Sequence, residues 1–133
     1  MPEWVIGKVS DALNKESKSL MNSKILVLGL SYKKDIDDVR ESPSVELMEL
    51  LKAKGAQIYY SDPYIPVFPK MRKHSFDLKS ILITPELLQE IDCTIISTDH
   101  EVFDYDLIHA YSKLIVDTRG VYRSITSDKI VRA

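Results

Sequence analysis

The sequence predicts an open parallel β-sheet covered by helices on both faces, a three-layer α/β/α domain. Short apolar runs bounded by Gly, Pro or Asp alternate along the chain with segments in which apolar residues recur at helical spacing. Such alternation is typical of parallel strands joined by helical crossovers, which are right-handed. The length of 133 residues suffices for one hydrophobic core.

An amphipathic helix is predicted first, over residues 2–14. Its apolar residues form a stripe that must be covered, and Pro2 suits the first helical position. Residues 14–24 are rich in Ser and Lys and are interpreted as a linker. A helix and a linker ahead of a compact domain suggest a piece of a larger protein.

A βαβ unit is predicted next. The continuous apolar run 25–28, closed by Gly29, is expected for a parallel strand covered on both faces. A Ser-Pro pair at 42–43 opens a helix as N-cap and first residue, and Gly55 stands where a C-cap glycine belongs. The second strand is predicted at 57–61.

The second half of the chain continues the alternation. Residues 63–80 contain three prolines and a short basic patch, and no regular structure is expected there. The remaining predicted elements are a short helix opened by Thr84-Pro85, a strand at 93–97, a helix capped by Asp104, a strand at 114–116, and a last short strand or helix between 121 and 131.

The composition narrows the class of protein. A hydrophobic fraction of 44% and a charged fraction of 29% are ordinary for a soluble globular protein, and the formal net charge of -2 gives no field for nucleic acid. Cys93 is the single cysteine, which excludes an internal disulfide and a Cys-rich metal site. No apolar run approaches the ~20 residues of a membrane span, and the N-terminus lacks the features of a signal peptide. We therefore expect a soluble, cytoplasmic protein.

Polar residues follow the predicted strands at the edge where ligands of open parallel sheets bind. The first such loop holds Lys33, Lys34 and Arg40 among acidic residues. These cations could clamp a phosphate, or they could form solvated surface ion pairs, which are common and contribute little. Arg119 follows the fourth strand, and its role has two similar interpretations. It could bind a phosphate or a sugar hydroxyl, or it could form an ion pair with a nearby aspartate.

Other polar residues at this edge have simpler interpretations. Gly29 supplies only the first glycine of the G-x-G-x-x-G fingerprint, so dinucleotide binding of the usual kind is not expected here. Asp62 before Pro63 is common turn chemistry. A lone His100 is interpreted as a satisfied structural residue, and Cys93 as a buried, inert thiol. No catalytic residue and no metal site are predicted.

Residues 24–43 resemble the start of the C-terminal domain of the UDP-glucose/GDP-mannose dehydrogenase family. The pattern there is a strand, then G-x-x-[YF]-K-x-[DN], then D-x-R-x-S. Three further segments continue the resemblance in the right order: the end of the second strand at Asp62-Pro63, residues 93–100, and residues 116–119. It is strong over most of the chain and weakest at 64–80.

The resemblance implies a Rossmann-like domain, over 21–133, that binds a UDP-linked sugar. Residues 1–20 would then be the end of the central dimerisation helix and its linker. Tyr32, Lys33 and Arg119 match positions that contact the nucleotide sugar, and Arg40 matches one that reaches NAD held by another domain. The segments 98–100 and 117–119 look closer to enzymes that oxidise UDP-linked N-acetylhexosamines.

For the whole protein, the resemblance implies a homodimeric enzyme of polysaccharide biosynthesis. It would oxidise the sugar C6 alcohol to a carboxylate with two NAD, using a catalytic Cys in an N-terminal domain. This chain alone is therefore expected to be inactive. Two alternatives stay open. The first is a stand-alone nucleotide-binding or dimerisation module. The second is a receiver-like signalling domain, which fits poorly because its acidic pair and its Lys are absent from the strand ends.

Overall fold

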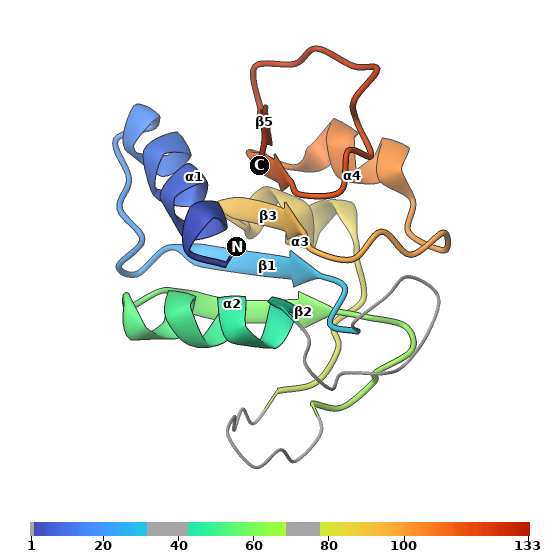
Figure 1. Cartoon of the computed structure of the whole chain (residues 1–133). Helices are drawn as coiled ribbons and strands as arrows, with labels where there is room; N and C mark the ends of the chain where they lie inside the picture. Colours follow the sequence, from blue (N-terminus) through green and yellow to red (C-terminus); the bar gives the residue numbers. More distant parts are fainter. Residues whose placement is uncertain (1, 32–42, 69–77) are drawn as a thin grey trace.

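The computed structural model describes residues 2–31, 43–68 and 78–133, and it shows one five-stranded parallel sheet between two pairs of helices (Figure 1). The strand order is β2-β1-β3-β4-β5. In chain order the elements are α1 (Pro2–Lys15), β1 (Lys24–Leu28), α2 (Pro43–Ala53), β2 (Gln57–Ser61), α3 (Pro85–Glu90), β3 (Cys93–Ile96), α4 (Tyr105–Tyr111), β4 (Ile115–Asp117) and β5 (Ile130–Arg132). The predicted three-layer α/β/α class is confirmed.

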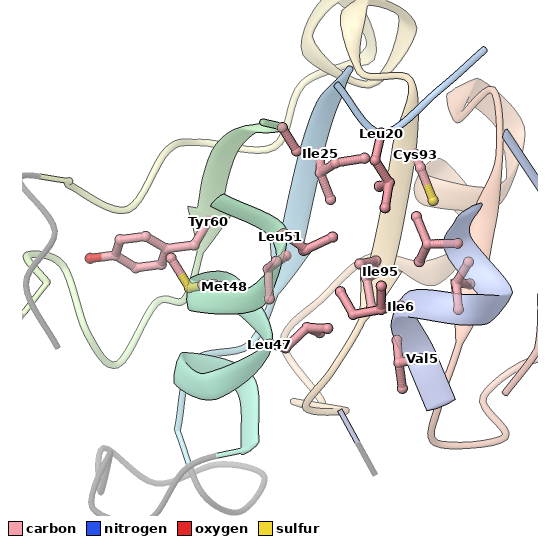
Figure 2. Close-up of a cluster of buried hydrophobic side chains, with 14 of the residues drawn as sticks. Val5, Ile6, Leu20, Ile25, Leu47, Met48, Leu51, Tyr60, Cys93 and Ile95 are labelled. Atoms are coloured by element: carbon pink, nitrogen blue, oxygen red, sulfur yellow. The ribbon is translucent and has the colours of Figure 1, made fainter. Parts of the chain in front are cut away.

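Each face of the sheet carries its own core. The first core lies between the sheet and the pair α1 and α2, with Met48 and Leu51 fully buried (Figure 2). Leu13 of α1 is fully buried in the same core. The second lies on the other face, under α3 and α4, where Leu88 and Ile108 are fully buried. Strand β1 contributes to both cores, which explains why its sequence is apolar without alternation.

Helix α1 packs inside the first core. Its apolar stripe, at Val5, Ile6, Val9, Ala12 and Leu13, is buried, and the helix contacts α2 and β4. Leu20, in the predicted linker, is buried in the same cluster. The apolar stripe of α1, for which the sequence names no covering surface, is therefore buried against other elements of this chain.

Element boundaries differ from the sequence-based ones by a residue or so. Strand β4 runs to Asp117, one residue later than predicted, because Asp117 pairs in register with Ile96 and Arg132. Of the strand or helix predicted between 121 and 131, the structure shows the strand, β5. In the irregular stretch after β2, Val67 and Lys79 form an isolated antiparallel bridge.

The strand order reverses direction between β1 and β3. From β1 the chain first crosses to β2 on one side, and from β3 it continues to β4 on the other. At such a switch point the loops leaving the two strands diverge, and ligands of open α/β sheets bind in the crevice between them. In the described ranges, no helix is both long and apolar enough to cross a membrane.

Candidate functional site

One buried carboxylate joins the ends of the first two strands at the switch point. Asp62 follows β2 and is fully buried. Its Oδ2 accepts hydrogen bonds from the backbone N–H of Leu30, at 2.7 Å, and of Ser31, at 3.1 Å. Its Oδ1 accepts from the backbone N–H of Tyr64 at 2.9 Å. The side chain thus fixes both the path out of β1 and its own turn.

His100 brings the end of β3 to the same carboxylate. Its Nε2 lies 2.9 Å from Asp62 Oδ2 and 3.2 Å from Ser31 Oγ, and the imidazole is fully buried. An ionised carboxylate can only accept, so Nε2 carries the proton in this contact. The ring contacts those of Tyr64 and Phe103, with centroid distances of 4.8 Å and 5.4 Å. His100 is thus the satisfied structural residue that the sequence indicates.

The hydrogen bonds keep Asp62 ionised despite its burial. Burial by itself raises the pKa of the carboxyl, because it disfavours the charged form. Hydrogen bonds from His100, Leu30 and Tyr64 favour that form and together outweigh burial, so the pKa lies below its ordinary value. A negative charge therefore persists inside this edge of the sheet at neutral pH.

Gly29 allows β1 to approach the end of β3. Its φ is +89°, and a Cβ at this position would lie 2.3 Å from the Cβ of Thr98. Thr98 Oγ1 in turn donates to the carbonyl of Ser31 at 2.8 Å. The glycine is thus used for close packing between strands as well as for a turn.

Arg119 lies at the carboxyl end of β4, on the other side of the switch point. Its Nε donates to the carbonyl of Ser97 at 2.8 Å, and Ser97 Oγ contacts Ser44 Oγ in the first turn of α2. Asp117 accepts the backbone N–H of Arg119 at 3.0 Å. Of the alternatives left open by the sequence, an ion pair between the guanidinium and Asp117 or Asp99 does not occur within the described part of the chain. The arginine is exposed and held beside the start of a helix.

Residues 26–124 match the model of the family described as "UDP-glucose/GDP-mannose dehydrogenase family, UDP binding domain". The chain belongs to this family.

Curated relatives agree with this assignment. The chain is 30% identical over 129 residues to UDP-N-acetyl-D-mannosamine dehydrogenase of Methanococcus maripaludis, a match that covers 91% of this chain and 28% of that protein. It is 32% identical over 130 residues to the Escherichia coli enzyme of the same name, covering 92% of this chain and 30% of that protein. The chain therefore spans less than a third of the relatives it matches.

Solved structures show the same fold. UDP-D-ManNAc dehydrogenase from Pyrococcus horikoshii superposes with a TM-score of 0.76 at 22% identity, over 98% of this chain and 30% of that one. A UDP-glucose dehydrogenase from Pyrobaculum islandicum superposes with a TM-score of 0.68 at 28% identity, over 97% and 29%. Members named for different sugars thus share this domain architecture.

The family-derived site residues are only partly in view. Tyr32, Lys33 and Arg40 lie outside the residues that the structure describes. Arg119 is described, and the structure places it at the predicted edge. The residue that sequence reasoning undervalued is Asp62, interpreted there as turn chemistry alone. Its signal in the sequence is only its place directly after a strand, at the edge that the ligand rule selects.

The described residues do not fit a dinucleotide cradle of their own. In such cradles a glycine leaves room for the pyrophosphate to approach the backbone. Gly29 stands at the first position of the fingerprint, that of the tight turn, and Thr98 packs beside it. The second position, where a glycine would let the pyrophosphate approach, is held here by the buried Ser31.

An apolar cavity of about 490 Å³ adjoins the Asp62 turn on the α3–α4 side of the sheet. Its walls include Ser61, Pro63, Ile81, Ile83, Phe103 and Leu107. This edge of the sheet therefore carries an apolar cavity and, at Arg119, an exposed guanidinium.

Cys93 has the inert setting that the sequence indicates. It is fully buried in the first core, and burial, together with the charge of Asp92, raises the pKa of its thiol far above the ordinary value. Thiolate chemistry requires the opposite setting, partly exposed and electropositive. Cys93 is therefore a packing residue in this domain.

Proposed function

We propose that this chain carries the UDP-binding domain of an NAD-dependent nucleotide-sugar 6-dehydrogenase. The observation that carries the proposal is the setting of Arg119. Ser97 holds its Nε, while its two terminal nitrogens donate to no group in the described part of the chain. A guanidinium fixed in this way presents a planar pair of donors, which suits phosphate oxygens.

The start of α2 supports the same ligand. Ser44 and Ser97 contact one another, so the first turn of α2 lies next to the backbone group that anchors Arg119. A helix N-terminus favours an anion. Tyr32 and Lys33 are the further proposed contacts with the nucleotide sugar, and Arg40 is the proposed contact with NAD.

The proposed substrate of the whole protein is a UDP-linked N-acetylhexosamine. The family description names UDP binding, and the curated relatives are named for UDP-N-acetyl-D-mannosamine. Oxidation of the C6 alcohol to a carboxylate would need a second, NAD-binding domain that supplies the catalytic Cys. We further propose a cytoplasmic homodimer that supplies sugar acids for polysaccharide synthesis. Residues 1–20 would be the end of its central helix and the linker that follows.

Calorimetric titration tests the proposal on the chain as it stands. UDP, UDP-N-acetylglucosamine, GDP and NAD are added separately to the parent chain and to the Arg119→Ala and Lys33→Ala variants. We expect saturable binding of the uridine ligands alone, weakened about tenfold or more by either substitution, because a charge-assisted contact to phosphate is lost.

Three results would contradict parts of this proposal. Equal binding of GDP would remove the preference for uridine. Failure of every ligand to bind would overturn a pre-formed half-site, although the family membership would stand. NAD reduction by this chain with any nucleotide sugar would show that it is active alone, contrary to expectation.

A further inference from the structure

We propose that Asp62 and His100 form a positioning pair, which holds Ser31 in place so that the chain leaves β1 in the orientation that UDP binding requires. This inference rests on the proposed function. It concerns two buried residues that do not themselves contact the ligand.

Ser31 is fixed through each of its polar groups. Its backbone N–H donates to Asp62 Oδ2 at 3.1 Å, and its carbonyl accepts from Thr98 Oγ1 at 2.8 Å. Its hydroxyl lies 3.2 Å from His100 Nε2. The side chain is 1% exposed. A residue held through three groups by two other loops has little freedom to reorient.

The charge of Asp62 strengthens the hydrogen bonds that fix Ser31. Three donors converge on one oxygen of Asp62, from Leu30, Ser31 and His100. Hydrogen bonds to an ionised acceptor are about twice as strong as neutral ones. If Asp62 were an amide, its NH₂ group would face a donor in either orientation, because Oδ1 also accepts, from the N–H of Tyr64.

The residues proposed to bind UDP come directly after Ser31 in the sequence, at Tyr32 and Lys33. The direction in which the chain leaves Ser31 therefore bears on their placement. Positioning of this kind matters because a displacement of about 1 Å in a binding group can strongly reduce its effect. The core does not require this arrangement, since apolar residues would pack without hydrogen bonds.

The chain offers a matched control at the opposite end of β1. Asp92 Oδ2 accepts the backbone N–H of Lys24 at 2.8 Å, and its Oδ1 accepts from Lys18 Nζ at 3.0 Å. Asp92 thus ties down the same strand by the same chemistry, but away from the proposed binding edge. Asp92→Asn should lower stability without touching the UDP site.

The experiment compares Asp62→Asn, His100→Leu, His100→Gln and Asp92→Asn with the parent chain. UDP affinity is measured by calorimetry at a temperature where circular dichroism shows every variant to be folded. We expect the Kd for UDP to rise about tenfold in Asp62→Asn and His100→Leu, the effect of losing one charge-assisted bond. His100→Gln keeps an N–H donor at the position of Nε2 and should recover most of the affinity. Asp92→Asn should bind like the parent.

Amide hydrogen exchange measured by NMR provides a readout that does not depend on the ligand. In Asp62→Asn we expect the amides of Leu30 and Ser31 to exchange about tenfold faster, while those of Leu26 and Val27 keep their protection. In Asp92→Asn the increase should fall on Lys24 instead.

The outcomes separate the inference from the proposed function. If the parent binds UDP and Asp62→Asn binds it equally well, the positioning role is overturned and UDP binding stands. If the parent binds no UDP, the proposed half-site fails and the positioning for UDP fails with it. The exchange rates still decide whether the pair holds Ser31, and unchanged exchange at Leu30 and Ser31 would refute the pair outright.

Discussion

The space beside Gly29 is filled by Thr98, whereas the space beside Gly7 is empty. The two glycines also differ in backbone conformation, since Gly29 has a φ of +89° and Gly7 lies inside helix α1. The same methyl group should therefore have opposite effects at the two positions.

We expect Gly29→Ala to lower the free energy of unfolding by about 2–4 kcal/mol, because it combines a left-handed backbone with overpacking. Gly7→Ala should raise it by about 0.5–1 kcal/mol, because alanine is the better helix former. Urea denaturation of both variants checks the pair. A stable Gly29→Ala variant would show that β1 and β3 can separate at this edge without cost.

Among single residues, the settings of Arg119 and Cys93 could be predicted from the sequence, but the role of Asp62 could not. Arg119 and Cys93 could be placed because each adjoins or lies in an apolar strand. The importance of Asp62 could not be predicted, because its partners Leu30 and His100 are 32 and 38 residues away. An Asp-Pro pair has the same local sequence whether the carboxylate caps a turn or joins three loops.

Among the elements, helix α1 is integral to the first core. Leu13 is fully buried on it, while Trp4 on the opposite face is 58% exposed. Lys8 Nζ lies over the Trp4 ring, 4.8 Å from its centroid. The helix contacts α2 and β4.

Leu13→Ala should therefore reduce the free energy of unfolding by about 2–5 kcal/mol, through lost burial and a cavity. Trp4→Ala should cost less than about 1 kcal/mol, since an exposed cation–π contact is weak. Thermal and urea unfolding of the two variants provide the comparison. Equal, small effects would mean that α1 is dispensable for folding of this domain.

The elements themselves could be predicted well because apolar runs, prolines and capping residues mark them locally. Thr84 caps α3 and Asp104 caps α4 as the sequence indicates, each accepting a backbone N–H from the first turn. The ends of β4 and the existence of β5 depend on pairing with distant strands, which a single sequence does not display.

For the whole molecule, the buried ionisable groups set the pH range of stability. Burial alone would raise the pKa of the fully buried Asp62 and of the partly buried Asp92, but hydrogen bonds lower both below their ordinary values. Burial, and then the charge of Asp62, raise the pKa of Tyr60 to about 12. The two carboxylates thus stabilise the fold fully at pH values above the pKa that they have in the unfolded chain. Neutral Tyr60 stabilises it fully at pH values below the pKa of tyrosine in the unfolded chain.

We expect the free energy of unfolding to fall as the pH drops below about 4, where unfolded carboxyls bind protons first. It should fall again above about pH 10, where unfolded tyrosine loses its proton first. Urea denaturation across pH checks both limits. Asp62→Asn should flatten the acid limb and Tyr60→Phe the alkaline limb, and unchanged slopes would assign the effects to other groups.

The parallel sheet also determines when this domain can fold during synthesis. Strand β1 lies between β2 and β3, yet the contact of Lys24 with Asp92 spans 68 residues. Until β3 has left the ribosome, β1 keeps one edge unpaired, and every strand pair requires closure of a crossover first. The switch point is therefore completed late, and a nascent chain that stops short of it exposes an apolar strand for which chaperones and other nascent chains compete.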